Sequence, residues 1–154
     1  MLTHIHVVRT ENGNLLSIDG REVDVLGEVK NHWVALNRNC KDVTVMNADK
    51  AAYRQAQDLI QAYSPPNSQS AKIASAWSSD RWLLMEVEFD ELLPAVVTLK
   101  ETNGEFTIVP HAVWSGYTHP WVAAPFIRDY LYRQAPDMPS ALLKCFTPQS
   151  QSFQ

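Results

Sequence analysis

The sequence has few glycines, few cysteines and no long run of apolar residues. Its 154 residues include five glycines and two cysteines. Glycine-rich phosphate-binding loops of the G-x-G-x-x-G or Walker type are absent, which excludes those classes of nucleotide-binding protein. No apolar run approaches the roughly 20 residues that a membrane helix needs. The N-terminus lacks the basic, apolar and small-residue pattern of a secretory signal, so we expect a soluble, cytoplasmic protein.

The two cysteines, Cys40 and Cys145, lie far apart in the sequence and form no C-x-x-C or metal-type spacing. A disulfide between them and two unpaired thiols both fit this pattern, and we expect unpaired thiols. Cys145 is followed by Phe146 in an apolar stretch. That setting favours a place in the core over a catalytic role.

Basic clusters and metal motifs are also missing. The 13 lysines and arginines are scattered singly in a chain of net charge −4, so we expect neither nucleic acid nor a membrane as partner. His4 and His6 alternate on a predicted strand, but zinc needs a third and usually a fourth ligand. We therefore predict no metal site and no cofactor.

The composition is that of a globular domain, with 45% hydrophobic residues. We predict one domain over residues 1–146 and a polar tail over 147–154. Short strands are predicted in the first third, with the Asp19-Gly20 pair as a hairpin turn. Their expected ranges are 5–9, 15–18, 22–26, 32–36 and 42–46.

A helix follows, capped by Asn47 or Asp49, with apolar residues at helical spacing up to Tyr63. Four further strands then form a predicted antiparallel meander, at 71–77, 82–89, 95–99 and 106–109. The chain ends in helices, a short one capped by Thr118, one beginning at Pro125, and one over 139–146. The fold class is therefore α+β, with an antiparallel sheet packed by one central helix and C-terminal helices.

Acidic residues gather in the meander. Glu86, Glu88 and Asp90 alternate along a predicted strand, so their side chains share one face, while Val87 points to the other. The segment 86–105 carries six acids and one lysine, which accounts for the whole net charge. An ordinary solvated face explains this pattern, and so does a surface for a basic protein partner. Convergence on a cation is disfavoured, because strand positions about 7 Å apart do not converge.

Aromatic residues and histidines gather just downstream, within residues 110–121. The candidate ligand- or partner-binding residues there are His111, Trp114, Tyr117, His119 and Trp121. Rings of this kind suit pockets and interfaces, and they equally suit packing of helices onto a sheet. No G-x-S-x-G elbow is present, and nothing recommends Ser115 as a nucleophile paired with either histidine.

The leading hypothesis is a small, acidic, non-catalytic binding protein that engages a protein partner as an adaptor, inhibitor, immunity protein or chaperone. The alternative is a small-molecule-binding or hydrolase-like domain. Its pocket would lie between helix and curved sheet, lined by the 111–121 segment. A third expectation is a homodimer formed through an edge strand such as residues 5–8.

Overall fold

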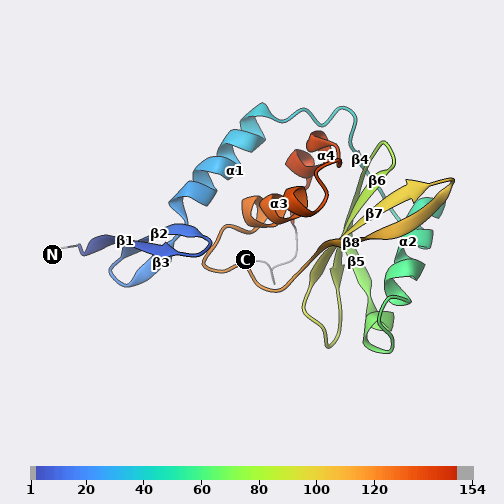
Figure 1. Cartoon of the computed structure of the whole chain (residues 1–154), viewed down its shortest axis with the longest axis horizontal. Coiled ribbons are helices and arrows are strands. Elements are labelled where there is room, and N and C mark those ends of the chain that lie inside the picture. Colours follow the sequence, from blue (N-terminus) through green and yellow to red (C-terminus); the bar gives the residue numbers. More distant parts are fainter. Residues whose placement is uncertain (1–2, 149–154) are drawn as a thin grey trace.

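The computed structural model describes residues 3–148 and folds them into four α-helices and two antiparallel sheets (Figure 1). This arrangement confirms the predicted α+β class. Residues 149–154 of the predicted polar tail lie outside the described residues. Within residues 3–148, no helix has the length and apolar character needed to cross a membrane.

The first sheet is a three-stranded antiparallel hairpin sheet. Its strands are β1 (Ile5–Thr10), β2 (Gly13–Ile18) and β3 (Arg21–Val23), in the order β1-β2-β3. Asp19 and Gly20 both have positive φ, 49° and 83°. Two such residues form the tight turn whose twist matches antiparallel strands. The predicted hairpin turn is therefore confirmed.

The next element is a helix, α1 (Val25–Asn37). The predicted strand at 22–26 is confirmed only at residues 22 and 23, which belong to β3, and the predicted strand at 32–36 is wrong. From Val25 onward the apolar residues recur at helical spacing. Asp24 caps the helix, and its Oδ1 accepts a hydrogen bond of 2.8 Å from the Gly27 backbone N–H. A methyl group at Gly27 would stand 2.0 Å from Asp24 Oδ2, so only glycine fits beside the cap.

Three elements follow α1 along the chain: β4 (Thr44–Val45), the helix α2 (Ala51–Gln61) and a 3₁₀ turn, η1 (Asn67–Ser70). The predicted central helix is confirmed, but its predicted cap is wrong. Lys50 precedes α2 and makes no capping bond. The Asn47 side chain instead accepts from the Asp49 N–H at 3.3 Å, which stabilises the turn before the helix.

The predicted four-stranded meander is confirmed as β5 (Lys72–Ser79), β6 (Trp82–Glu88), β7 (Ala95–Thr102) and β8 (Glu105–Ser115). The strand β4 pairs with β5 and adds a fifth strand at the edge. Asn103 and Gly104, at φ 54° and 81°, form the tight turn between β7 and β8.

The strand β8 is longer than predicted because it continues through a bulge. Val97 pairs with Val113, whereas Leu99 pairs with Ile108, so four residues of β8 oppose Thr98 alone. His111 lies in this bulge with φ 69°. Val97 and Leu99 project from the same face of β7, so their partners Val113 and Ile108 also lie on one face of the sheet. Both pack in the core on the α2 side.

Two helices complete the fold, α3 (Ala123–Gln134) and α4 (Ser140–Cys145). The predicted helix capped by Thr118 is wrong. That segment forms a turn, in which the Trp121 N–H donates to the Thr118 carbonyl at 2.7 Å. The helix α3 begins at Ala123, so Pro125 is its third residue and not its first.

The five-stranded sheet is covered on both faces, by α3 and α4 on one side and by α2 on the other (Figure 1). Alternate residues of β6 therefore enter different cores. Trp82 and Leu84 pack with α3 and α4, and Leu83 and Met85 pack with α2. The three-stranded sheet and α1 lie at the other end of the molecule (Figure 1).

A disulfide joins Cys40, just after α1, to Cys145 at the end of α4, with the two Cα atoms 5.8 Å apart. The expectation of unpaired thiols is wrong. The packing of α1 against α3 and α4 brings the two cysteines together, and spacing in the sequence does not reveal this. The bond ties the C-terminal end of α1 to the body of the protein.

Candidate functional site

The aromatic residues of the 111–121 segment are mostly packed against α3. The Trp114 ring meets Phe126 and Tyr130 edge-on, with centroids 5.3 and 5.4 Å apart. The Trp121 ring stacks on Phe126 at 5.9 Å. These contacts fasten α3 to the sheet, which is the packing role that the sequence left open.

The other three predicted residues of this segment are exposed to solvent. His111 and His119 are exposed, and Tyr117 is 65% exposed. The backbone carbonyl of His111 accepts a hydrogen bond from Tyr130 Oη at 3.1 Å. The structure therefore does not gather these five residues around one cavity.

The three predicted acidic residues also differ in environment. Glu86 is fully buried, because α3 and α4 cover the face of β6 from which it projects. Its Oε1 accepts from Ser75 Oγ at 3.1 Å. Glu88 and Asp90 are exposed, and Asp90 pairs with Lys72 at 3.5 Å. The expectation of one exposed acidic face containing all three is wrong for Glu86.

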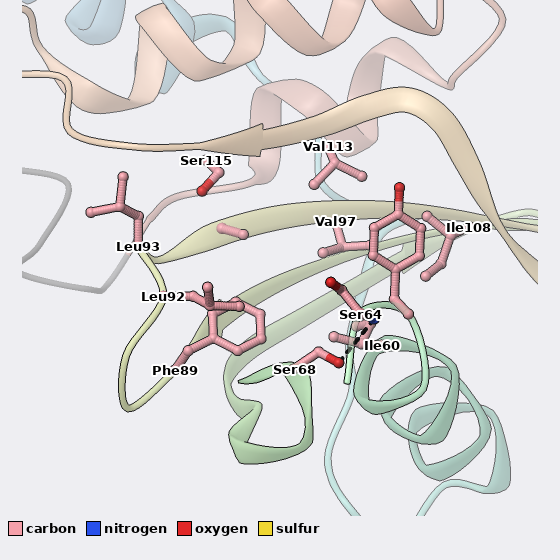
Figure 2. Close-up of a pocket in the computed structure, with 12 residues that line it drawn as sticks. Ile60, Ser64, Ser68, Phe89, Leu92, Leu93, Val97, Ile108, Val113 and Ser115 are labelled. Carbon is pink, nitrogen blue, oxygen red and sulfur yellow. Dashed lines mark hydrogen bonds between the residues drawn. The ribbon is translucent and has the colours of Figure 1, made fainter. Parts of the chain in front are cut away.

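An apolar cavity with a volume of about 330 Å³ lies between α2 and the other face of the sheet. Figure 2 shows the side chains that line this cavity. Ile60, Ser64 and Ser68 come from α2 and the chain that follows it, and Phe89, Leu92 and Leu93 come from the loop between β6 and β7. The floor is formed by strands β7 and β8, and the lining residues from these strands are Ala95, Val97, Ile108, Val113 and Ser115.

The chemistry of the pocket is set by its lack of charge. None of the twelve lining residues is charged, and none is a histidine. Ser68 is occupied within the fold, since its Oγ donates to the Gln61 carbonyl at 2.7 Å and accepts from the Ser64 N–H at 3.0 Å. Only the hydroxyls of Tyr63, Ser64 and Ser115 remain to orient a ligand.

None of the eight residues predicted from the sequence lines this pocket. This pocket does lie between a helix and the sheet, but of the 111–121 segment Val113 and Ser115 line it, and the predicted histidines and aromatic residues do not. The residues that line the pocket come from four separate stretches of the sequence. Aliphatic residues at alternating strand positions predict a buried face, and they carry no signal for an unfilled volume.

A second candidate surface is the outer side of α1 with the three-stranded sheet. Its exposed apolar residues are Ile5, Val7, Val23, Val25, Leu26, Val29, Trp33 and Leu36. The inner side of α1 contacts α3 through Asn31, which accepts from Arg128 Nη1 at 3.3 Å. Arg128 also donates to the Phe146 carbonyl. Burial, together with the nearby Arg38, lowers the pKa of Arg128 to about 10.

Within residues 3–148, no three histidine, cysteine or acidic side chains are grouped closely enough to hold a metal ion. Comparisons with protein-family models, curated proteins and solved structures find no match to this chain. The two apolar sites themselves are therefore the features from which a function can be inferred.

Proposed function

We propose that this protein is a non-catalytic binding protein that holds a compact, neutral, apolar small molecule between α2 and the five-stranded sheet. The observation that carries this proposal is a cavity of about 330 Å³ with twelve lining residues and no charge among them. Ligand pockets are typically concave, largely apolar and furnished with a few polar groups. An uncharged lining disfavours carboxylate, phosphate and ammonium ligands, whose charges would be desolvated without a partner.

The pocket volume sets the size of the ligand. A water-sized group occupies about 30 Å³ in a liquid, so the cavity accommodates roughly ten non-hydrogen atoms. Burying ten carbons is worth about 8 kcal/mol, and association costs at least about 4 kcal/mol of that. At that minimum cost about 4 kcal/mol of binding free energy remains, so the expected dissociation constant is on the order of 1 mM.

The same lining argues against the hydrolase alternative. A serine nucleophile needs an adjacent base, which is most often a histidine oriented by a carboxylate. Ser115 lines the pocket, but neither His111 nor His119 does. The hydroxyl groups therefore serve to orient a ligand.

The test uses 1-naphthol, which is neutral at pH 7, and 1-naphthoate, its anionic counterpart. Titration of the oxidised protein, followed by amide chemical shifts, should show 1-naphthol binding with shifts concentrated in α2, β7 and β8. The carboxylate should bind at least about tenfold more weakly, a difference of about 1.4 kcal/mol.

Two variants make the test specific. Ser115→Trp places a large ring in the pocket from an exposed strand position and should abolish binding. Thr107→Trp is the matched control, because Thr107 is exposed on the same strand and does not line the pocket. Equal binding of naphthol and naphthoate, or undiminished binding to Ser115→Trp, would contradict the proposal.

Protein binding is the second candidate function, as the composition and charge first suggested. The specific observation in its favour is the exposed apolar stripe of α1, where Trp33 is 68% and Leu36 81% exposed. Apolar patches of this kind mark interaction surfaces. The acidic residues offer less support, since Glu86 is buried and Asp90 is paired with Lys72.

The cellular compartment is part of this proposal. Disulfides are rare in the cytosol and persist in oxidising compartments. The Cys40–Cys145 bond therefore favours an oxidising compartment over the cytoplasm that the sequence suggested. Thiol labelling of the protein in its native host, with and without prior reduction, tests this directly. Two labelled thiols before reduction would restore the cytoplasmic prediction.

A further inference from the structure

The helix α1 presents its apolar side to solvent. At 3.6 residues per turn, Val25, Leu26, Val29, Trp33 and Leu36 fall within an arc of about 100°. All five are exposed, by 43% to 81%. An arc of this width is the side that a helix of a globular protein normally buries.

The helix is firmly held in this orientation. At its N-terminus, Asp24 Oδ2 accepts from the Val122 N–H at 3.0 Å, and at its C-terminal end Cys40 is bonded to Cys145. Between them, Lys30 pairs with Asp129 of α3 at 3.4 Å. The inner side of α1 is thus committed to the fold, and the apolar stripe is left as a preformed outer surface.

The three-stranded sheet also carries exposed apolar residues, and it leads directly into α1, since Val23 ends β3 and Val25 begins α1. The register aligns Val7 with Leu16 and Leu16 with Val23, so these side chains share one face of the sheet. Val7 is 60% exposed, as is Ile5 on the same face. In the described chain β1 pairs only with β2, so its outer edge leaves backbone donors and acceptors without strand partners.

We infer that this N-terminal apolar surface, formed by Ile5, Val7, Val23, Val25, Leu26, Val29, Trp33 and Leu36, is covered by a second copy of the chain in a two-fold symmetric dimer. The inference rests on the second candidate function, that this surface binds protein.

The area of this apolar surface supports a second copy of the chain as its binding partner. From the exposed fractions, the eight side chains leave roughly 650 Å² of apolar surface. A stable interface buries about 800 Å² on each partner, a little over half of it apolar. The surface is therefore large enough for a stable dimer.

Charge and edge geometry point the same way. Residues 1–38 hold five acids and four basic residues, whereas the acidic excess lies in residues 86–105 of the larger sheet. Two copies of the N-terminal surface can therefore meet without strong repulsion. A free antiparallel edge is complementary to itself, because two such edges related by a two-fold axis can pair.

Sedimentation velocity of the oxidised protein from 1 to 100 µM tests the inference. We expect a dimer of twice 17.4 kDa. The double variant Val29→Asp with Trp33→Glu should weaken dimerisation at least about 100-fold. Both residues are more than 60% exposed in the single chain, so circular dichroism of the variant should be unchanged. Val45→Glu is the control, since Val45 is also 63% exposed but lies in β4 of the larger sheet.

A wild-type monomer at 100 µM would overturn the inference, and so would a dimer that the double variant leaves intact. The candidate protein-binding function fails separately. If the wild type is monomeric but captures a protein from its native host, and the double variant does not, the partner is a different protein. If neither association nor α1-dependent capture occurs, both ideas are wrong.

Discussion

Removing the Cys40–Cys145 disulfide should cost a large part of the stability of the protein. The two residues are 105 positions apart, so the bond closes most of the chain into a loop. In the chain-entropy model, a loop of about 100 residues raises the free energy of unfolding by about 4.7 kcal/mol, and measured values are usually smaller. We expect a loss of about 3 to 5 kcal/mol in the Cys40→Ser, Cys145→Ala variant. A domain of this size is stabilised by only about 5 to 15 kcal/mol.

Urea unfolding measures this loss. The variant should have a lower midpoint and a somewhat larger m-value, because an uncrosslinked unfolded chain exposes more surface. The melting temperature should fall by about 10 to 15 °C. Reductant should destabilise the wild type by a similar amount and leave the variant unchanged. An unfolding free energy within about 0.5 kcal/mol of the wild type would refute the reasoning, as would two free thiols in the unreduced protein.

Three further substitutions test other parts of the structure. Gly27→Ala should lower the unfolding free energy, measured in urea, by about 1 to 3 kcal/mol, because the methyl group displaces Asp24 from its capping position. We expect this loss although alanine is the better helix former; a stabilised variant would contradict this. Arg128→Met should cost about 2 to 4 kcal/mol, because it leaves the buried Phe146 carbonyl without its donor; calorimetry would show an unchanged melting temperature if that bond were unimportant. Ser115→Lys should strengthen 1-naphthoate binding at least about fivefold over the wild type, because the mouth of the pocket gains a cation; an unchanged affinity in calorimetric titration would count against the assigned site.

The hairpins of both sheets were predictable because their turn signals are local. Asn103-Gly104 and Asp19-Gly20 are residue pairs that accept positive φ, and the structure has positive φ at all four. The helix α1 was not predicted, although Asp24 followed by apolar residues at helical spacing was a usable signal. His32 to Leu36 also reads as a short apolar strand, and short windows do not separate the two.

The functional sites depended on information that is not local. Alternation correctly placed Glu86 on the face opposite Val87. It could not show that α3 and α4 cover that face. The pocket is assembled from stretches between residues 60 and 115, and the disulfide from residues 105 apart. Tertiary packing decides both, and no motif in the sequence marks either one.

The proposed function requires that the pocket beneath α2 is the ligand site. Intermolecular nuclear Overhauser effects between 1-naphthol protons and labelled methyl groups test it most directly. We expect contacts to Ile60, Val97, Ile108 and Val113, which line the pocket. Contacts confined to Val29 and Leu36 of the exposed α1 stripe, with none to the pocket methyl groups, would contradict it.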